Sequence, residues 1–217
     1  MQSVLPSIVS AVAGLLGVCV GGAIAWIRES LKEKKGDKKE LLLLAILVSA
    51  HLDRFVDGCV AVAFDDGSAY GQPSGEDGQT YEPTTEIPIF DPLSLEVEWR
   101  VLPPALMQRV LSLPHRVEKM QRKLADIVEY DHGPHYEQFF AARQWDFTLL
   151  ALEVSETIQK LRAHAKLPDE PEIEGEWDRT AHLEDFKKDL VEKRAEQEAK
   201  RARSLEELRP LNSSCTG

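Results

Sequence analysis

The chain opens with an uncharged apolar stretch from Val4 to Ile27, and this stretch limits the possible folds more than any other feature. As an α-helix, 24 residues span about 36 Å, which is enough to cross a hydrocarbon core of about 30 Å. Trp26 lies at its end, and the basic residues Arg28, Lys32, Lys34, Lys35, Lys38 and Lys39 follow. The positive-inside rule therefore predicts a single-pass anchor over residues 1–27 and a basic juxtamembrane segment over residues 28–39.

This prediction places the protein in the inner or plasma membrane, with its N-terminus outside and everything after Arg28 in the cytoplasm. Two alternatives are a cleaved signal peptide and a buried soluble helix. Ala23-Ile24-Ala25 resembles a signal-peptidase site, but a secretory signal begins with a basic region, and no lysine or arginine precedes Val4.

Small residues recur along one face of the predicted anchor. Gly14, Gly17 and Gly21 lie three or four residues apart, and Gly17 and Gly21 form a GxxxG pattern. Transmembrane helices pack closely through such faces, so these glycines predict helix–helix association and a homo-oligomer. The alternative is that they reflect the general abundance of glycine in membrane helices.

The charge distribution bears on the partners. The formal net charge of -11 argues against nucleic acid, because phosphate binding needs a basic surface. The basic juxtamembrane segment is instead suited to anionic lipid headgroups. The three cysteines, Cys19, Cys59 and Cys215, lie far apart and show neither a disulfide framework nor a metal-binding spacing, which favours a reducing compartment.

Beyond the anchor, the pattern of apolar residues predicts an all-α fold, an antiparallel helical bundle over residues 40–166. The run from Leu41 to Val62 contains Asp53, Arg54 and Asp57 near its middle. Charges at those positions cost too much in a bilayer for a second span, so this run is expected to be a core helix. A heptad pattern then predicts a helix that needs a helical partner, with a break after Leu113. Its members are Leu106, Val110, Leu113, Val117, Met120, Leu124 and Ile127.

A long irregular acidic insertion, residues 65–104, separates these helices. Repeated glycine and proline exclude a long helix there, and nine acidic residues but no basic one lie between Asp65 and Trp99. We expect its first half to be a solvated loop that opens before the bundle does. Its second half should form a strap across the helices, with a short strand near residues 95–100.

The turn Asp131–Pro134 precedes a third long helix, expected from about His135 to Lys166. An acidic linker over residues 167–179 should follow, then a charged helix over residues 180–209 and a disordered tail over residues 210–217. Leu183, Phe186 and Leu190 form a short apolar set on the charged helix. They either contact a protein partner or dock the helix onto the bundle.

Three groups of residues suggest chemistry, but none forms a strong motif. Asp131, His132, His135 and Glu137 offer metal-binding side chains, the loop 65–79 has some calcium-ligand residue types, and His51 lies near Asp53 and Asp57. The sequence predicts no catalytic residue, no cofactor and no metal site. It favours an interaction or scaffold module that contacts an unidentified protein. The alternatives are a membrane-tethered metal-dependent hydrolase and an envelope sensor domain of reversed topology.

Overall fold

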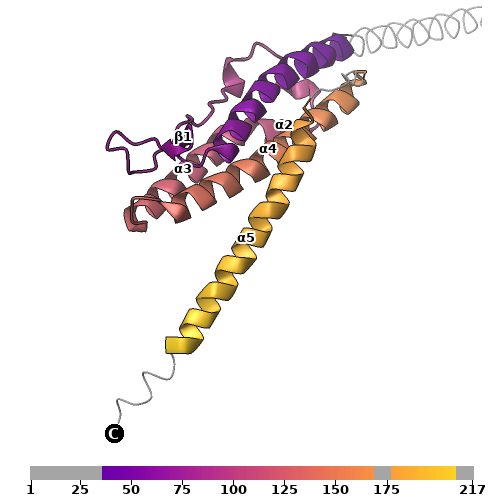
Figure 1. The fold of residues 1–217 in the computed structure, drawn as a ribbon. Coiled ribbons are helices and arrows are strands. Elements are labelled where there is room, and N and C mark those ends of the chain that lie inside the picture. The colour runs from indigo at the N-terminus through magenta and orange to yellow at the C-terminus, as the bar shows by residue number, and fades with distance from the viewer. Residues whose placement is uncertain (1–35, 169–176, 209–217) are drawn as a thin grey trace, which may run out of the picture.

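The structure is a computed structural model that describes residues 36–168 and 177–208. This part of the chain is mostly helical, which confirms the all-α prediction (Figure 1). The first helix covers residues 36–64 and is followed by α2 (Pro104–Leu111), α3 (Leu113–Tyr130), α4 (Glu137–Ala165) and α5 (Arg179–Leu208). No described helix is long and apolar enough to cross a membrane. The predicted anchor, with Gly14, Gly17 and Gly21, and the predicted tail lie outside the described residues.

Helix α4 is the centre of the bundle because it buries side chains toward several neighbours. Its buried apolar residues include Phe147, Leu150, Val154 and Leu161, which belong to one core cluster with residues of the first helix, α3 and α5. The first helix contributes a stripe at helical spacing, as the sequence predicted. Its fully buried members are Leu44, Val48, Leu52, Cys59 and Val62, and the neighbouring Val56 is also fully buried.

Ion pairs show that α2 and α3 run antiparallel to α4. Arg109 pairs with Glu156, Arg116 with Glu153, and Lys123 with Asp146. As residue numbers rise along α2 and α3, their partners' numbers fall along α4. The heptad pattern therefore has the helical partner that it predicted, and Val110, Leu113, Val117 and Leu124 are buried. The break between α2 and α3 falls at Ser112, with Pro114 in the first turn of α3, where a missing backbone N–H costs little.

The second half of the insertion crosses the first helix as a strap. Pro88 packs against Gly58, where a Cβ atom would lie 2.5 Å from the proline Cβ, and the tilted rings of Phe90 and Phe55 pack with their centroids 5.7 Å apart. Glycine at residue 58 is therefore what permits the close approach.

The strand predicted near residues 95–100 is wrong. Two short 3-10 helices, Pro92–Ser94 and Trp99–Val101, occupy this part of the chain. The reason is local hydrogen bonding: Leu95 N–H donates to the Pro92 carbonyl and Leu102 N–H donates to the Trp99 carbonyl. These groups are satisfied within the strap, so no neighbouring strand is needed.

Helix α5 begins beside the bundle and crosses α4 in the opposite direction. Gln197, Lys200 and Arg201 still border a groove beside the first turn of α4, and the last residues of α5 extend away from the other helices (Figure 1). The first part of the insertion forms a small hairpin at the far end of the first helix. Its two short antiparallel strands are β1 (Ser68–Ala69) and β2 (Gln72–Pro73).

Candidate functional site

A buried ion pair lies at the end of the first helix. Asp65 and Arg143 are 5% and 1% exposed, and the Arg143 Nη1 donates to Asp65 Oδ2 over 2.6 Å. The second guanidinium nitrogen of Arg143 donates to the Thr85 carbonyl, and the Gln144 amide donates to the Asp65 carbonyl. This pair ties both ends of residues 65–85 to α4.

The carboxylate of Asp65 accepts four further hydrogen bonds. The donors are Gly67 N–H, Thr84 N–H, the Thr84 hydroxyl and Thr85 N–H, at 2.9 to 3.0 Å. Burial acts to raise the pKa of Asp65. The hydrogen bonds from Gly67, Arg143, Thr84 and Thr85 outweigh burial and hold the pKa below its ordinary value. Asp65 is therefore a charged group that organises the loop around it.

Asp66, Glu76 and Asp77 are exposed, as expected for a solvated acidic loop, but part of the loop is packed. Asp65 is buried, Gly67 has a φ of 77° and lies against the Phe140 ring, and Ser74 donates to the carbonyls of Gly67 and Glu82. Asp77, which the calcium-loop idea included, accepts hydrogen bonds from Gln79 and Thr80 and closes a local turn. These carboxylates already have partners within the loop.

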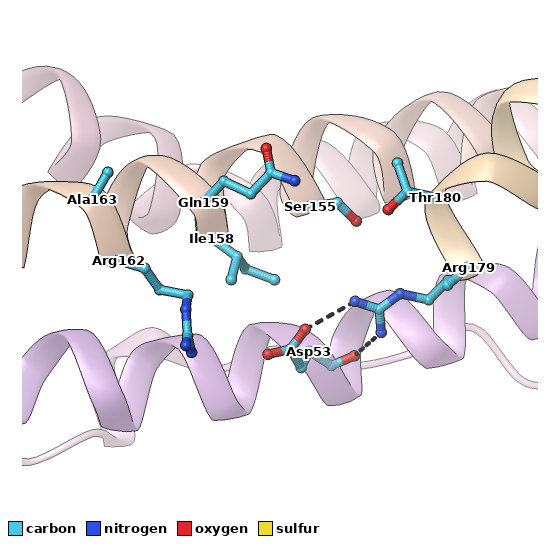
Figure 2. A pocket seen from close by; sticks show the side chains of 8 residues that line it. All are labelled: Asp53, Ser155, Ile158, Gln159, Arg162, Ala163, Arg179 and Thr180. Atoms are coloured by element: carbon cyan, nitrogen blue, oxygen red, sulfur yellow. Dashed lines mark hydrogen bonds and ion pairs between the residues drawn. The ribbon is translucent and has the colours of Figure 1, made fainter. Parts of the chain in front are cut away.

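A polar pocket of about 490 Å³ lies between the first helix, α4 and the start of α5. Figure 2 shows Arg179 reaching across it to the first helix, where it donates to Asp53 Oδ1 and to the Asp53 carbonyl. Arg179 also pairs with Asp57 over 2.6 Å. Burial acts to lower the pKa of Arg179, but the hydrogen bonds that Arg179 donates to Asp53 and Asp57 raise it overall. The pocket is therefore crossed by a structural ion pair that joins α5 to the first helix.

Ser155 contributes an unusual hydroxyl to this pocket. The residue is 6% exposed, and its Oγ has no hydrogen-bond partner in the described part of the protein. Among the described residues, Ser49 on the first helix is the other one with a buried hydroxyl that has no hydrogen-bond partner. The Arg162 guanidinium at the pocket's other end donates to the Pro168 carbonyl. The pocket has hydrogen-bonding groups, but its two arginines already have partners.

The predicted metal candidates around Asp131 have structural roles instead. The Asp131 carboxylate accepts a hydrogen bond from Phe139 N–H over 2.8 Å and so caps the start of α4, while the His135 ring stacks on Tyr81. His132 is exposed, and so is Glu137. Within residues 36–168 and 177–208, no group of three or more metal-ligating side chains comes together.

The polar residues of the first helix also separate. His51 points to solvent, whereas Asp53 and Asp57 are both bound by Arg179, more than 120 residues later in the chain. Cys59, on the same helix, is fully buried, and burial raises the pKa of its thiol.

Sequence reasoning missed Arg143 and Arg179. A signal for Arg143 was present, because it lies three residues after Phe140 and four before Phe147, within the apolar stripe of α4. A basic residue at such a position must find an acidic partner inside the fold. No comparable signal marked Arg179, which stands next to an acidic segment.

Of the two alternatives for α5, the structure has the docked one. Leu183 is fully buried and Leu190 is 5% exposed, while Phe186 stacks on Phe64 with ring centroids 4.5 Å apart. Further along, the Arg194 guanidinium lies 3.9 Å from the centre of the Trp145 ring. A protein partner could contact Leu183, Phe186 and Leu190 only if α5 first separated from the bundle.

An apolar face remains uncovered on the first helix. It consists of Leu42, Leu43, Ile46 and Leu47, which are 42%, 53%, 49% and 38% exposed. The residues between them, Leu44 and Ala45, are fully buried in the core. This end of the helix is therefore apolar on both its inner and its outer side.

Comparison with known proteins gives no match: no family model, no curated protein and no solved structure corresponds to this chain.

Proposed function

We propose that this protein is a membrane-anchored helical interaction module that acts by contact with a protein partner. The anchor is the uncharged stretch Val4–Ile27, and the lysines that follow it favour a cytoplasmic bundle. The bundle supplies a rigid body, and α5 supplies the part that reaches a partner.

The observation that carries this proposal is the contrast between the two parts of α5. Its first part is fixed by buried Leu183 and Leu190 and by the ion pairs of Arg179. Every residue from 195 to 204 is exposed, and we call this segment the distal arm. A helix that is polar on all sides has no face to bury in its own fold, so this exposure favours a role outside it.

The composition of the distal arm favours a protein over a nucleic acid. It contains two acidic residues, Glu196 and Glu198, and three basic residues, Lys200, Arg201 and Arg203. The acidic side chains would repel a phosphate backbone, whereas a protein surface with its own mixed charges can complement both signs. Complementary charges of this kind determine which partner binds more than how tightly it binds.

Site-specific photo-crosslinking in living cells tests the contact. A photoreactive residue at Ala199, in the distal arm, should give discrete adducts with a protein. The same residue at Ala61, an exposed position on the first helix, serves as the matched control and should give none. Equal labelling at both positions, or none at Ala199, would contradict the proposal.

Truncation separates the arm from the docked part. Deleting residues 195–217 removes the arm but keeps Leu183, Leu190 and Arg194, so the melting temperature should change little. The protein identified in the Ala199 adducts of the full chain should no longer co-purify with the truncated one. A large loss of stability would show that the arm is structural.

The orientation is tested by a reporter enzyme fused after Gly217. Activity restricted to the cytoplasm is expected. Activity on the outer side would overturn the cytoplasmic placement and favour the reversed-topology sensor.

A further inference from the structure

We propose that the apolar face of the first helix, Leu42, Leu43, Ile46 and Leu47, rests on the surface of an anionic lipid bilayer. This inference depends on the anchoring proposed above and adds to it the surface through which the bundle meets the membrane. The bundle would then lie against the bilayer with its first helix along the surface.

The position of the apolar face in the chain favours the bilayer as its occupant. Leu42 follows the end of the uncharged stretch, Ile27, by 15 residues. With Val4–Ile27 in the membrane, the face is held within a short length of chain from the bilayer. The eight residues between Ile27 and the described start of the helix at residue 36 give enough chain to turn the helix along the surface.

Charge complementarity supports the same occupant. Between Arg28 and Glu40, six basic residues outnumber four acidic ones. Lys39 and Glu40 are both exposed one turn before the apolar face, and Lys39 shares its side of the helix with Leu43 and Ile46 at spacings of four and seven residues. Helices that lie in the membrane interface combine basic side chains with apolar ones in this way. Anionic headgroups attract basic residues close to the surface and repel the acidic remainder of the bundle.

A second copy of the chain fits the apolar face less well. Four partly exposed side chains offer on the order of 300 Å², whereas a stable protein interface needs about 800 Å² from each partner. In a parallel pair, Lys39 of one copy would also face Lys39 of the other, and like charges at an interface disfavour association. A bilayer avoids both difficulties because the anchor already holds the face beside it.

The test measures whether Ile46 touches lipid in the full-length protein. Cys19 and Cys215 are replaced by serine, and buried Cys59 is kept because it is inaccessible to labelling reagents. Ile46→Cys carries an environment-sensitive fluorophore, and the protein is reconstituted in phosphatidylcholine vesicles with or without phosphatidylglycerol. Val191→Cys is the matched control, because Val191 and Ile46 are both 49% exposed and Val191 lies on α5.

We expect quenchers attached to lipid chains to reduce the fluorescence at residue 46 at least about twofold more than at residue 191, with a larger difference when phosphatidylglycerol is present. Lys38→Gln together with Lys39→Gln should reduce the phosphatidylglycerol dependence at residue 46, because Arg28, Lys32, Lys34 and Lys35 remain. Equal quenching at the two positions would overturn the inference and leave the anchor intact, provided that the protein floats with the vesicles.

Other outcomes are also decisive. If Ile46→Cys forms a disulfide-linked dimer and lipid quenchers have no effect, the face binds a second copy and the inference is wrong. If the protein does not float with the vesicles, the anchor is wrong and the inference fails with it.

Discussion

Replacing Arg143 by methionine should destabilise the bundle strongly, because it leaves the buried carboxylate of Asp65 without its counter-charge. The two side chains are 2% and 1% exposed, and the Nη1–Oδ2 distance is 2.6 Å. Removing one partner of a buried ion pair costs about 3–5 kcal/mol. Against a total stability of about 5–15 kcal/mol, this is a large fraction.

The expected change in melting temperature follows from that magnitude. For a domain of this size, each 1 kcal/mol lowers the midpoint by about 2–4 °C, so Arg143→Met should lower it by about 6–20 °C. The measurement is thermal unfolding of the full chain in a mild detergent, followed by far-ultraviolet circular dichroism.

Arg116→Met is the matched control. Arg116 also donates two hydrogen bonds of 2.6 Å to one carboxylate, that of Glu153, but these two side chains are 33% and 39% exposed. Solvent screens such a pair, and its loss should cost about 0–1 kcal/mol. Equal destabilisation by the two variants would refute the argument that burial of the Asp65–Arg143 pair sets the cost.

A double-mutant cycle isolates the pair itself. Asp65→Asn leaves Arg143 buried without a carboxylate, and the variant with both substitutions should lose less stability than the two single losses added together. The same variants should be cut earlier than the wild type between residues 66 and 85 in limited proteolysis, because Arg143 holds both ends of that segment. Simple additivity would mean that the two side chains contribute independently.

Four further outcomes are expected. Asp65 has a lower pKa in the folded than in the unfolded protein. The stability that it contributes is therefore present above about pH 4 and is lost as the pH falls through the pKa of the folded protein. Asp65→Asn should make the free energy of unfolding, measured by urea titration, depend less on acid pH. Gly67→Ala should lower the melting temperature more than Gly71→Ala: both have positive φ, but a Cβ at residue 67 would lie 2.3 Å from Phe140. Leu183→Ala should cost about 2–5 kcal/mol, measured in the same way. Ser155→Ala should leave stability unchanged or raise it by up to about 1 kcal/mol, because its hydroxyl has no partner among the described residues.

The helices could be predicted from the sequence because their apolar residues recur with helical spacing. The heptad pattern around Val110 and Val117 predicted both the α2–α3 segment and its need for a helical partner. Periodicity is a local property, and a pattern of seven well-spaced positions outweighs the propensities of individual residues.

The organisation of the acidic insertion could not be predicted, because it depends on a contact across 78 residues. In the sequence, Asp65 is one of nine acidic residues in a segment rich in glycine and proline, and its composition does not distinguish it from the others. Its burial is possible because Arg143, on α4, supplies the charge and because Gly67, Thr84 and Thr85 supply hydrogen bonds. Nothing in the local pattern specifies which distant residue provides such a counter-charge.

The docking of α5 was left undecided for a related reason. Leu183, Phe186 and Leu190 are equally suited to packing on a bundle or on a partner. Two further contacts favour the bundle, the ion pair of Arg179 and the packing of Arg194 on Trp145. A short apolar set is ambiguous until its surroundings are known.

The first helix joins the two proposed contact surfaces mechanically. The apolar face is at its beginning, and Asp53 and Asp57, which hold Arg179 at the base of α5, are two to three turns further along. Ile46 and Asp57 are about 16 Å apart along the helix axis. Because the residues between them include the buried core positions Leu52 and Val56, this segment cannot bend without disrupting the core. Contact of the apolar face with a bilayer would therefore fix the direction in which α5 leaves the bundle, and the distal arm would be presented at a defined angle to the membrane.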